Sequence, residues 1–277
     1  MLLELAIADA YSAELIDCPL EFVVAHNNLD TYGKNGDEGV FPGCYTAITQ
    51  SNIAIAKMLI PGHPWVKEFL ANSLTTTFKQ DPRIRYGDEL DKLLQQVRDG
   101  GELIDKIDPY QNLDDPAVRS MPIGILSTPE EVIKASMTHG AITNNTPDSL
   151  YATIAVGLMC HYFIYRLGKK EQLKDFLNIY IVTDWLESGK TPSKNLITTK
   201  YAIEAVIKHH SLSQLLQQCV TFSGRSDHIS AIAVAAASCS QEYERDLPQC
   251  LFDRLENNLY GRDYLTRLEQ QLYQNKG

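Results

Sequence analysis

The 277-residue sequence has few of the features that mark secreted, zinc-binding or nucleic-acid-binding proteins. Its six cysteines are scattered, with no Cys-x-x-Cys pair and no Cys/His cluster at the spacing of a zinc site. Cysteines distributed in this way are typical of small buried side chains in a reducing compartment. Basic residues are in the minority, because 25 Lys and Arg face 35 Asp and Glu and give a formal net charge of −10. This acidic balance argues against a nucleic-acid-binding surface as the main function.

Long hydrophobic runs are also scarce. The most apolar one, residues 149–166, contains Thr153, His161 and three tyrosines and is marginal in length for a bilayer span. It therefore predicts a helix buried in a protein core. The first residues include Glu4 and Asp9 and no basic group, which does not fit a signal peptide. We expect a soluble, cytoplasmic protein with no membrane partner.

Strand signals are weak, since no alternating β-branched runs are joined by Asn-Gly or Asp-Gly turns. Helix start and stop signals are dense instead. Thr128 and Glu131 flank Pro129 in a capping box, while Gly140 and the Gly100-Gly101 pair are interpreted as helix ends. The predicted helices span 49–59, 64–78, 88–98, 129–138, 146–167, 171–177, 199–209, 212–219, 229–240 and 263–273.

The predicted helices alternate with loops from end to end, without a linker, a low-complexity tract or a repeat. Residues 229–238 are small and apolar on every side, which favours a central helix closely surrounded by others. The sequence thus predicts a single compact all-α domain over residues 1–277.

General catalytic signatures are missing, because the chain has no Gly-x-Ser-x-Gly elbow, Walker loop or Rossmann fingerprint. Polar groups gather instead where loops meet helix starts, the places at which unpaired N–H groups and the helix dipole favour ligands. Four such segments stand out: residues 8–22, 44–50, 114–124 and 223–232.

Together, in order and spacing, these segments resemble the ADP-ribosylglycohydrolase family, the all-helical dinuclear-magnesium enzymes that include dinitrogenase reductase-activating glycohydrolase. The family's early Gly-Asp-Ala and Pro-x-Glu-Phe motifs correspond to residues 8–10 (Ala-Asp-Ala) and 19–22 (Pro-Leu-Glu-Phe), so Glu21 is kept. The resemblance covers nearly the whole chain. It implies an all-helical fold and a cleft for ADP-ribosyl substrates.

Both metal motifs of the family are altered in this chain. Tyr-Thr-Asp-Asp-Thr becomes Tyr-Thr-Ala-Ile-Thr at 45–49, and Gly-Gly-Asp-Thr-Asp-Thr becomes Ser-Gly-Arg-Ser-Asp-His at 223–228. The six ligand positions implied by the resemblance are Thr46, Ala47, Ile48, Arg225, Asp227 and His228. Mg²⁺ requires oxygen ligands, mostly carboxylates, and only Thr46 and Asp227 retain the family's ligand. We therefore expect no bound magnesium and no other cofactor.

Arg225 stands two residues from Asp227 and could occupy the space of the lost cations by pairing with that carboxylate. The alternative is a solvated loop arginine. His228 is interpreted mainly as a capping or packing residue at the start of its helix.

The family's Gly-Asn-Gly-x-x-Met-Arg-x-x-Pro loop corresponds to residues 113–122, in which Arg119 matches but the glycines become Leu113 and Asp115 and the asparagine becomes Asp114. Close backbone approach to a pyrophosphate needs glycine, and two carboxylates repel it. His139 matches the family's Thr-His segment, with a C-terminal helix cap as its alternative role. The resemblance predicts that the segments around Thr46, Arg119 and Asp227 meet at one cleft.

Two functions follow. The first is a non-catalytic member of this fold, whose cleft serves contact with a protein partner or sensing of an ADP-ribose-like small molecule. The second is a hydrolase of an ADP-ribosyl or related N-glycosidic bond that uses Glu21, Asp227 and His139 with an altered or absent metal.

Overall fold

The computed structural model describes residues 1–16, 18–33, 41–60, 63–111, 115–187 and 192–274. Within these ranges the chain is helical and forms no β-strand, apart from one isolated bridge between Ser211 and Glu244. The predicted all-α fold is confirmed. The α-helices are α1 (Leu2–Ala13), α2 (Leu20–His26), α3 (Ala47–Met58), α4 (Lys67–Gln80), α5 (Asp88–Gln96), α6 (Gly100–Lys106), α7 (Pro129–Thr143), α8 (Pro147–Ile164), α9 (Leu173–Tyr180), α10 (Lys194–Lys208), α11 (Leu212–Cys219), α12 (Ser226–Ser238), α13 (Gln249–Arg254) and α14 (Arg262–Gln274). Four short 3₁₀ helices are η1 (Pro116–Arg119), η2 (Met121–Ile125), η3 (Lys170–Gln172) and η4 (Asp184–Leu186).

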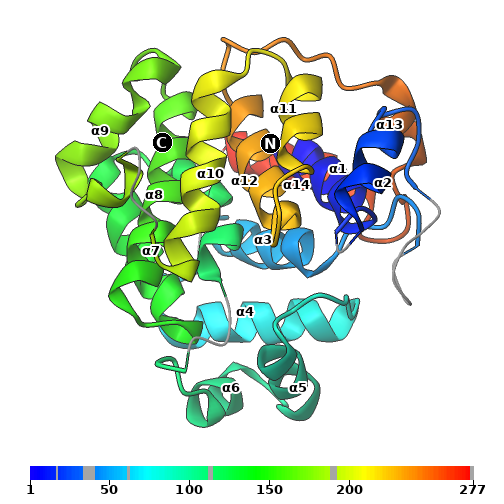
Figure 1. Cartoon of the computed structure of the whole chain (residues 1–277). Helices are drawn as coiled ribbons and strands as arrows, with labels where there is room; N and C mark the ends of the chain where they lie inside the picture. The colour runs from blue at the N-terminus through cyan, green and yellow to red at the C-terminus, as the bar shows by residue number, and fades with distance from the viewer. Residues whose placement is uncertain (17, 34–40, 61–62, 112–114, 188–191, 275–277) are drawn as a thin grey trace.

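Helix α12 is the centre of the molecule. All of its residues from Ser226 to Ser238 are buried, and α1, α8, α10 and α11 pack around it (Figure 1). Its many alanine and serine side chains let these neighbours approach closely on every side. The predicted central helix is confirmed, although it begins at Ser226 rather than at Ile229.

Helix α1 packs along α12 in the opposite direction. The Met1 ammonium faces Cys239 at the end of α12, and Glu4 Oε1 lies 3.7 Å from Arg245 Nη1 beyond that end. Because the two helices have similar lengths, the later residues of α1 lie beside the start of α12. Asp9 and Glu14 are thereby brought toward the loop that precedes α12.

Helix α7 begins at the predicted capping box, in which Thr128 and Glu131 exchange side chain-to-backbone hydrogen bonds of 3.2 Å and 3.1 Å. Its predicted end at Gly140 is wrong, since the helix continues to Thr143. A Cβ at Gly140 would lie 3.2 Å from the Thr153 side chain. The glycine therefore serves the close packing of α7 on α8 rather than a helix end.

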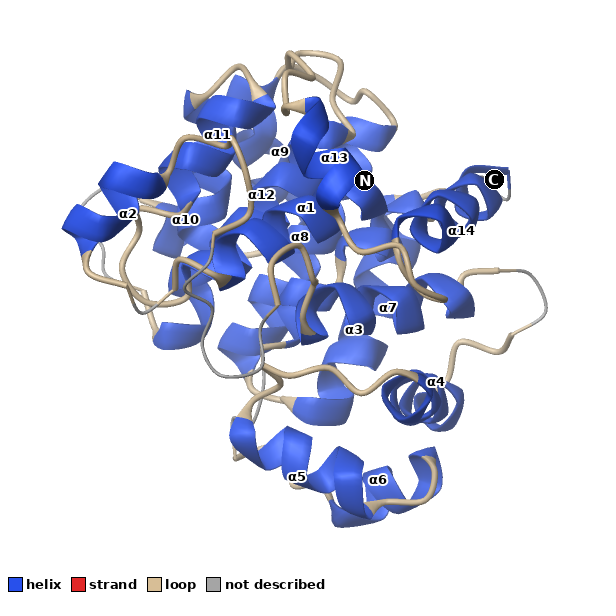
Figure 2. Ribbon diagram, turned by 90° about the vertical axis from the view of Figure 1, so that its right-hand side faces the viewer, coloured by secondary structure: helices blue, strands red, loops and turns tan. Residues whose placement is uncertain are grey.

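The lower end of the molecule is formed by α4, α5 and α6, as both views show (Figures 1 and 2). Gly100 was predicted to end a helix with Gly101, yet it begins α6, with Asp99 as N-cap accepting from Glu102 N at 3.0 Å. A Cβ at Gly100 would lie 2.1 Å from Asn72 N. The absence of a side chain allows α6 to lie directly against α4.

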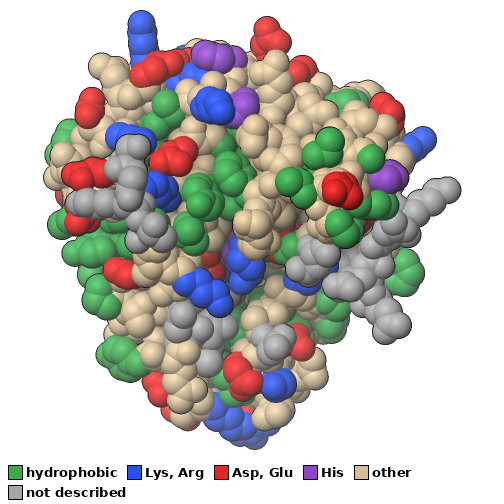
Figure 3. Space-filling model, viewed as in Figure 1, with side chains coloured by type: hydrophobic (Ala, Val, Ile, Leu, Met, Phe, Trp, Pro, Cys, Tyr) green, Lys and Arg blue, Asp and Glu red, His purple; other side chains and the backbone are tan. Residues whose placement is uncertain are grey.

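Helix α8 is almost entirely buried, as expected for a core helix. No helix in the described ranges is long and apolar enough to cross a bilayer. On the face in Figure 3, acidic and basic side chains are interspersed with apolar ones.

Candidate functional site

One buried carboxylate, that of Asp9 in α1, is hydrogen-bonded to the start of α3. Asp9 Oδ1 accepts from the Thr46 hydroxyl at 2.7 Å, and Oδ2 accepts from Thr46 N at 2.9 Å and from the Thr49 amide and hydroxyl at 3.0 Å and 2.7 Å. Burial raises the pKa of Asp9, while these four hydrogen bonds act in the opposite direction. Both oxygens of this carboxylate are thus committed to capping α3.

Thr46 is the N-cap of α3 and also accepts from Ile48 N through its side chain at 3.3 Å. The next two residues, Ala47 and Ile48, are 3% and 2% exposed and belong to the buried face of the helix. They present no oxygen where the family's motif has two carboxylates. This end of α3 is therefore a packed helix start with hydroxyl groups only.

The start of α12 holds a small charged cluster. Arg225 Nε lies 3.7 Å from Asp227 Oδ1, and the Arg225 guanidinium donates to His228 Nε2. His228 Nδ1 lies 3.4 Å from Asp115 Oδ2, so this ring connects the arginine to the carboxylate of a different segment. Asp227 Oδ1 also accepts from His228 N at 2.8 Å. The arginine that replaces a carboxylate in the family's motif thus lies beside Asp227, although its own side chain is 44% exposed.

The segment that contains Arg119 packs between α3 and α7. Arg119 is 2% exposed and donates to the Thr143 hydroxyl in α7. Its neighbour Ser120 lies 3.0 Å from His139 Nε2. His139 is completely buried within α7, so its predicted alternative role as a C-terminal cap is wrong. Burial and the Arg119 guanidinium hold the pKa of His139 well below its usual range.

The segments around Thr46, Arg119 and Asp227 are joined through shared neighbours. Asn52 of α3 donates to Val118 O in η1 at 2.9 Å, and the contact between His228 and Asp115 joins η1 to α12. Helix α1 completes the link, because it packs on α12 and carries the Asp9 that caps α3. These contacts place the three segments next to one another, as predicted. That they line a common cleft stays a prediction.

Glu21 and His139, two residues that the sequence predicts to act together, differ in exposure. Glu21 is exposed on α2, and His139 has no exposed surface. Leu113 and Asp114, from the loop matched to the family's substrate loop, lie outside the described residues.

Neither the capping role of Asp9 nor a role for a second acidic side chain, Glu14, at the end of α1 was predicted from the sequence. One signal was present: Asp9 interrupts an otherwise apolar run, which is typical of a buried and hydrogen-bonded carboxylate. Its partners in α3 are 37 and 40 positions away and could not be read from the local pattern.

Comparison with known proteins settles the family. The model of the ADP-ribosylglycohydrolase family matches residues 1–277. The chain belongs to the ADP-ribosylglycohydrolase family. Its fold is similar to that of a solved structure described as "ADP-ribosylglycohydrolase-related protein complex", with a TM-score of 0.73 and 16% sequence identity, covering 100% of this chain and 96% of the other. No curated protein is significantly similar to the chain in sequence.

The two magnesium ions that the family resemblance implies do not fit the residues present. Asp9 accepts four hydrogen bonds from Thr46 and Thr49. Asp227 faces Arg225 and His228 N, and the side chains of Ala47 and Ile48 have no oxygen. In the part of the chain that the structure describes, no group of three or more His, Cys, Asp or Glu is arranged to hold a metal ion.

Proposed function

We propose that this chain is a family member of the dinitrogenase reductase-activating glycohydrolase type whose metal motifs have degenerated, and that it acts without catalysis. In this proposal it senses an ADP-ribose-like small molecule or contacts a protein partner in the cytoplasm. It needs no metal cofactor. Its excess of acidic residues, with a formal charge of −10, supports partners other than nucleic acid.

The main support for the proposal comes from the side chains at the start of α3. A dinuclear magnesium centre acts by polarising substrate oxygens and by generating a nucleophile from bound water. Such a centre needs several carboxylates with free lone pairs. Here Ala47 and Ile48 stand at the positions of the two motif carboxylates, and both oxygens of the nearby Asp9 accept hydrogen bonds from Thr46 and Thr49.

The charge at the start of α12 supports the same conclusion. Arg225 contributes a positive charge beside Asp227, where a second divalent cation would be repelled. The alternative hydrolase would need Glu21, Asp227 and His139 to act on one bond. It is disfavoured because His139 is buried and Glu21 is exposed on α2.

Hydrolysis of ADP-ribosylated arginine and serine peptides, assayed with and without Mg²⁺, tests the proposal. We expect no turnover by the wild-type chain under either condition, and a thermal shift or calorimetric signal on addition of ADP-ribose. The matched comparison is the triple variant Ala47→Asp, Ile48→Asp and Arg225→Asp, which returns three motif carboxylates. We expect this variant, and not the wild type, to be stabilised by Mg²⁺.

Turnover by the wild-type chain would overturn the proposal. If that turnover rose with Mg²⁺, and if purified protein carried two divalent ions per chain by inductively coupled plasma analysis, the metal centre would be intact. Turnover that is independent of Mg²⁺ would favour the alternative hydrolase.

A further inference from the structure

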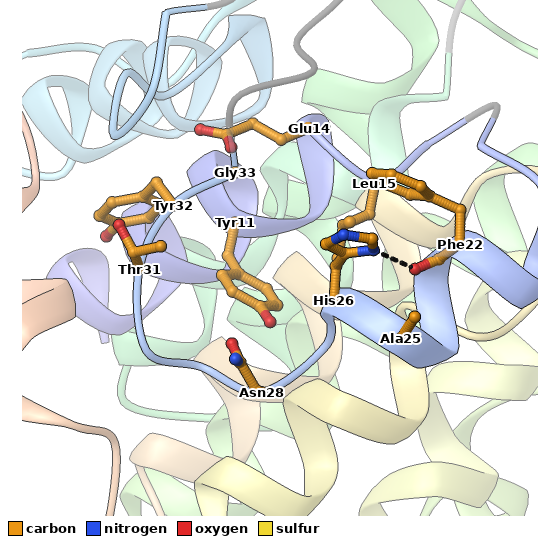
Figure 4. Close-up of a pocket in the computed structure, with 10 residues that line it drawn as sticks. All are labelled: Tyr11, Glu14, Leu15, Phe22, Ala25, His26, Asn28, Thr31, Tyr32 and Gly33. Atoms are coloured by element: carbon orange, nitrogen blue, oxygen red, sulfur yellow. Dashed lines mark hydrogen bonds between the residues drawn. The ribbon is translucent and has the colours of Figure 1, made fainter.

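A cavity of about 330 Å³ opens at the end of α1, between α2 and the segment 28–33. This volume is at the lower end of the range for small-molecule sites. Figure 4 shows Tyr11 in the middle, with Tyr32 and Thr31 on one side and Phe22 and His26 on the other. None of the residues that cap α3 or pair with Asp227 lines this cavity.

The lining is mainly aromatic. The Tyr11 and Tyr32 rings have centroids 6.5 Å apart and are tilted by 58°. Phe22 and His26 stack with centroids 3.9 Å apart and an interplanar angle of 21°. The His26 ring is oriented by its Nδ1, which lies 2.8 Å from Phe22 O.

Both tyrosine hydroxyls are already used by the protein. Tyr11 Oη donates to Asn27 Oδ1 and accepts from Leu29 N, each at 3.2 Å, and Tyr32 Oη donates to Leu251 O at 2.8 Å. Tyr11 and Tyr32 are 2% and 3% exposed, so a ligand would meet small parts of their rings rather than their hydroxyl groups. Aromatic faces carry negative quadrupole charge and attract cations.

Glu14 is the acidic side chain of the cavity and is only 2% exposed. Its Oε1 accepts from Gly43 N at 3.2 Å. Its Oε2 lies against Gly33, where a Cβ would be 2.8 Å away, and the backbone N–H groups of Gly33 and Gly43 both act to lower the pKa of this carboxylate. Burial raises the pKa of Glu14 to about 7, and no described Lys or Arg forms an ion pair with it. Among the residues that the structure describes, the carboxylate therefore has no cationic partner.

We propose that this cavity binds a small organic ammonium cation, held by the Glu14 carboxylate and by the faces of Tyr11, Tyr32 and Phe22. A bound cation supplies the missing counter-charge, and its alkyl groups lie against the rings, as in other aromatic cages. A phosphate or carboxylate ligand is disfavoured by charge, because the described lining residues include the Glu14 carboxylate and neither Lys nor Arg. The net charge of −10 also raises the local concentration of cations.

This inference does not rest on the proposed loss of catalysis, since the cavity shares no residue with the capped start of α3 or with the Asp227 cluster. An ADP-ribosyl hydrolysis assay therefore tests the proposed function, and a cation-binding assay tests this inference, independently of each other.

The test compares choline with 3,3-dimethylbutan-1-ol, a neutral molecule of the same shape, by isothermal titration calorimetry on the full chain at about pH 8, above the Glu14 pKa. We expect saturable binding of choline and affinity at least about tenfold weaker for the neutral alcohol. Because this comparison uses only the wild-type chain, it does not depend on the folding of any variant.

Variants of the lining residues then test whether choline binds in this cavity. Glu14→Gln and Tyr32→Leu should each weaken choline binding by at least about tenfold, whereas Tyr32→Phe, which keeps the ring, should retain most of it. Glu89→Gln on α5, an exposed carboxylate far from the cavity, should bind choline like the wild type. The proposal is overturned if choline shows no saturable binding, if the neutral alcohol binds equally well, or if folded Glu14→Gln binds choline unchanged.

Discussion

Asp9 accepts hydrogen bonds from both the backbone N–H and the hydroxyl of Thr49, at 3.0 Å and 2.7 Å. A carboxylate from α1 therefore caps α3 from outside, where the unpaired N–H groups and the helix dipole favour negative charge. In the dinuclear centre that the family resemblance implies, metal-binding side chains occupy this helix start. In this chain the Asp9 carboxylate and the Thr46 hydroxyl cap this helix start.

Asp9→Ala should be strongly destabilising, because it leaves two buried amides and two buried hydroxyls without their acceptor. We expect the free energy of unfolding to fall by about 3–5 kcal/mol, measured by urea denaturation. Thr49→Val removes one hydroxyl and should cost about 1–2 kcal/mol. Asp253→Ala, at an exposed position of α13, is the control and should change stability by less than about 0.5 kcal/mol. A loss for Asp9→Ala no larger than the control's would contradict this role.

Glu14→Gln should make the chain more stable at alkaline pH. The pKa of Glu14 is about 7 in the folded state, above its ordinary value of 4.5, so the folded state holds a proton that the unfolded state has released. The contribution of this group to stability is therefore complete at acidic pH and is lost as pH rises toward 7. We expect the variant to exceed the wild type by about 1–2 kcal/mol at alkaline pH and to match it near pH 4. Thermal melts across this pH range provide the measurement, and a constant difference at every pH would contradict the assignment.

The sequence was most informative where structure depends on neighbours along the chain. The capping box at Thr128 appears as predicted, and the helix predicted over residues 212–219 is α11. The misassigned helix ends at Gly100 and Gly140 have a common cause, since both glycines serve contacts with another helix. Local patterns indicate that a glycine is special, but not whether the reason is a turn or a neighbouring helix.

Prediction of the candidate functional site from local sequence patterns was limited in the same way. The sequence predicts altered metal motifs at residues 45–49 and 223–228, and it also predicts the pair of Arg225 with Asp227. The partners of Asp9 and Glu14 could not be predicted, because they come from segments separated along the chain and brought together only by packing. Long-range polar contacts of this kind leave no periodic signal in the sequence.

Arg225→Ala should lower stability only slightly, despite the burial of Asp227. The pair is long at 3.7 Å and the arginine is partly exposed, while Asp227 lies in the first turn of α12, where the helix dipole also favours a carboxylate. We expect a loss of about 1 kcal/mol or less. Arg225→Asp should cost more, because it places a second negative charge beside Asp227. Differential scanning calorimetry distinguishes these effects, and equal melting temperatures for the two variants would argue against the ion pair.

His139 should resist protonation in the folded chain. The Ser120 hydroxyl donates to Pro116 O at 3.0 Å, so at the 3.0 Å contact with His139 it must accept, and His139 Nε2 carries the proton. The second nitrogen, Nδ1, is buried without a hydrogen-bond partner among the described residues. Protonation would place a charge there, close to the Arg119 guanidinium.

The consequence is a loss of stability in acid. The folded-state pKa of His139 is well below its ordinary value of 6.5, so its contribution to stability is complete above that value and declines as pH falls below it. His139→Gln should therefore remove the loss of stability that occurs as pH falls below 6.5. Glu14→Gln should instead remove the loss that occurs as pH rises. Nitrogen-15 NMR of the imidazole should show a neutral ring with the proton on Nε2 well below its ordinary pKa of 6.5. A ring that titrates near its ordinary pKa would instead make His139 accessible for acid–base chemistry and revive the hydrolase alternative.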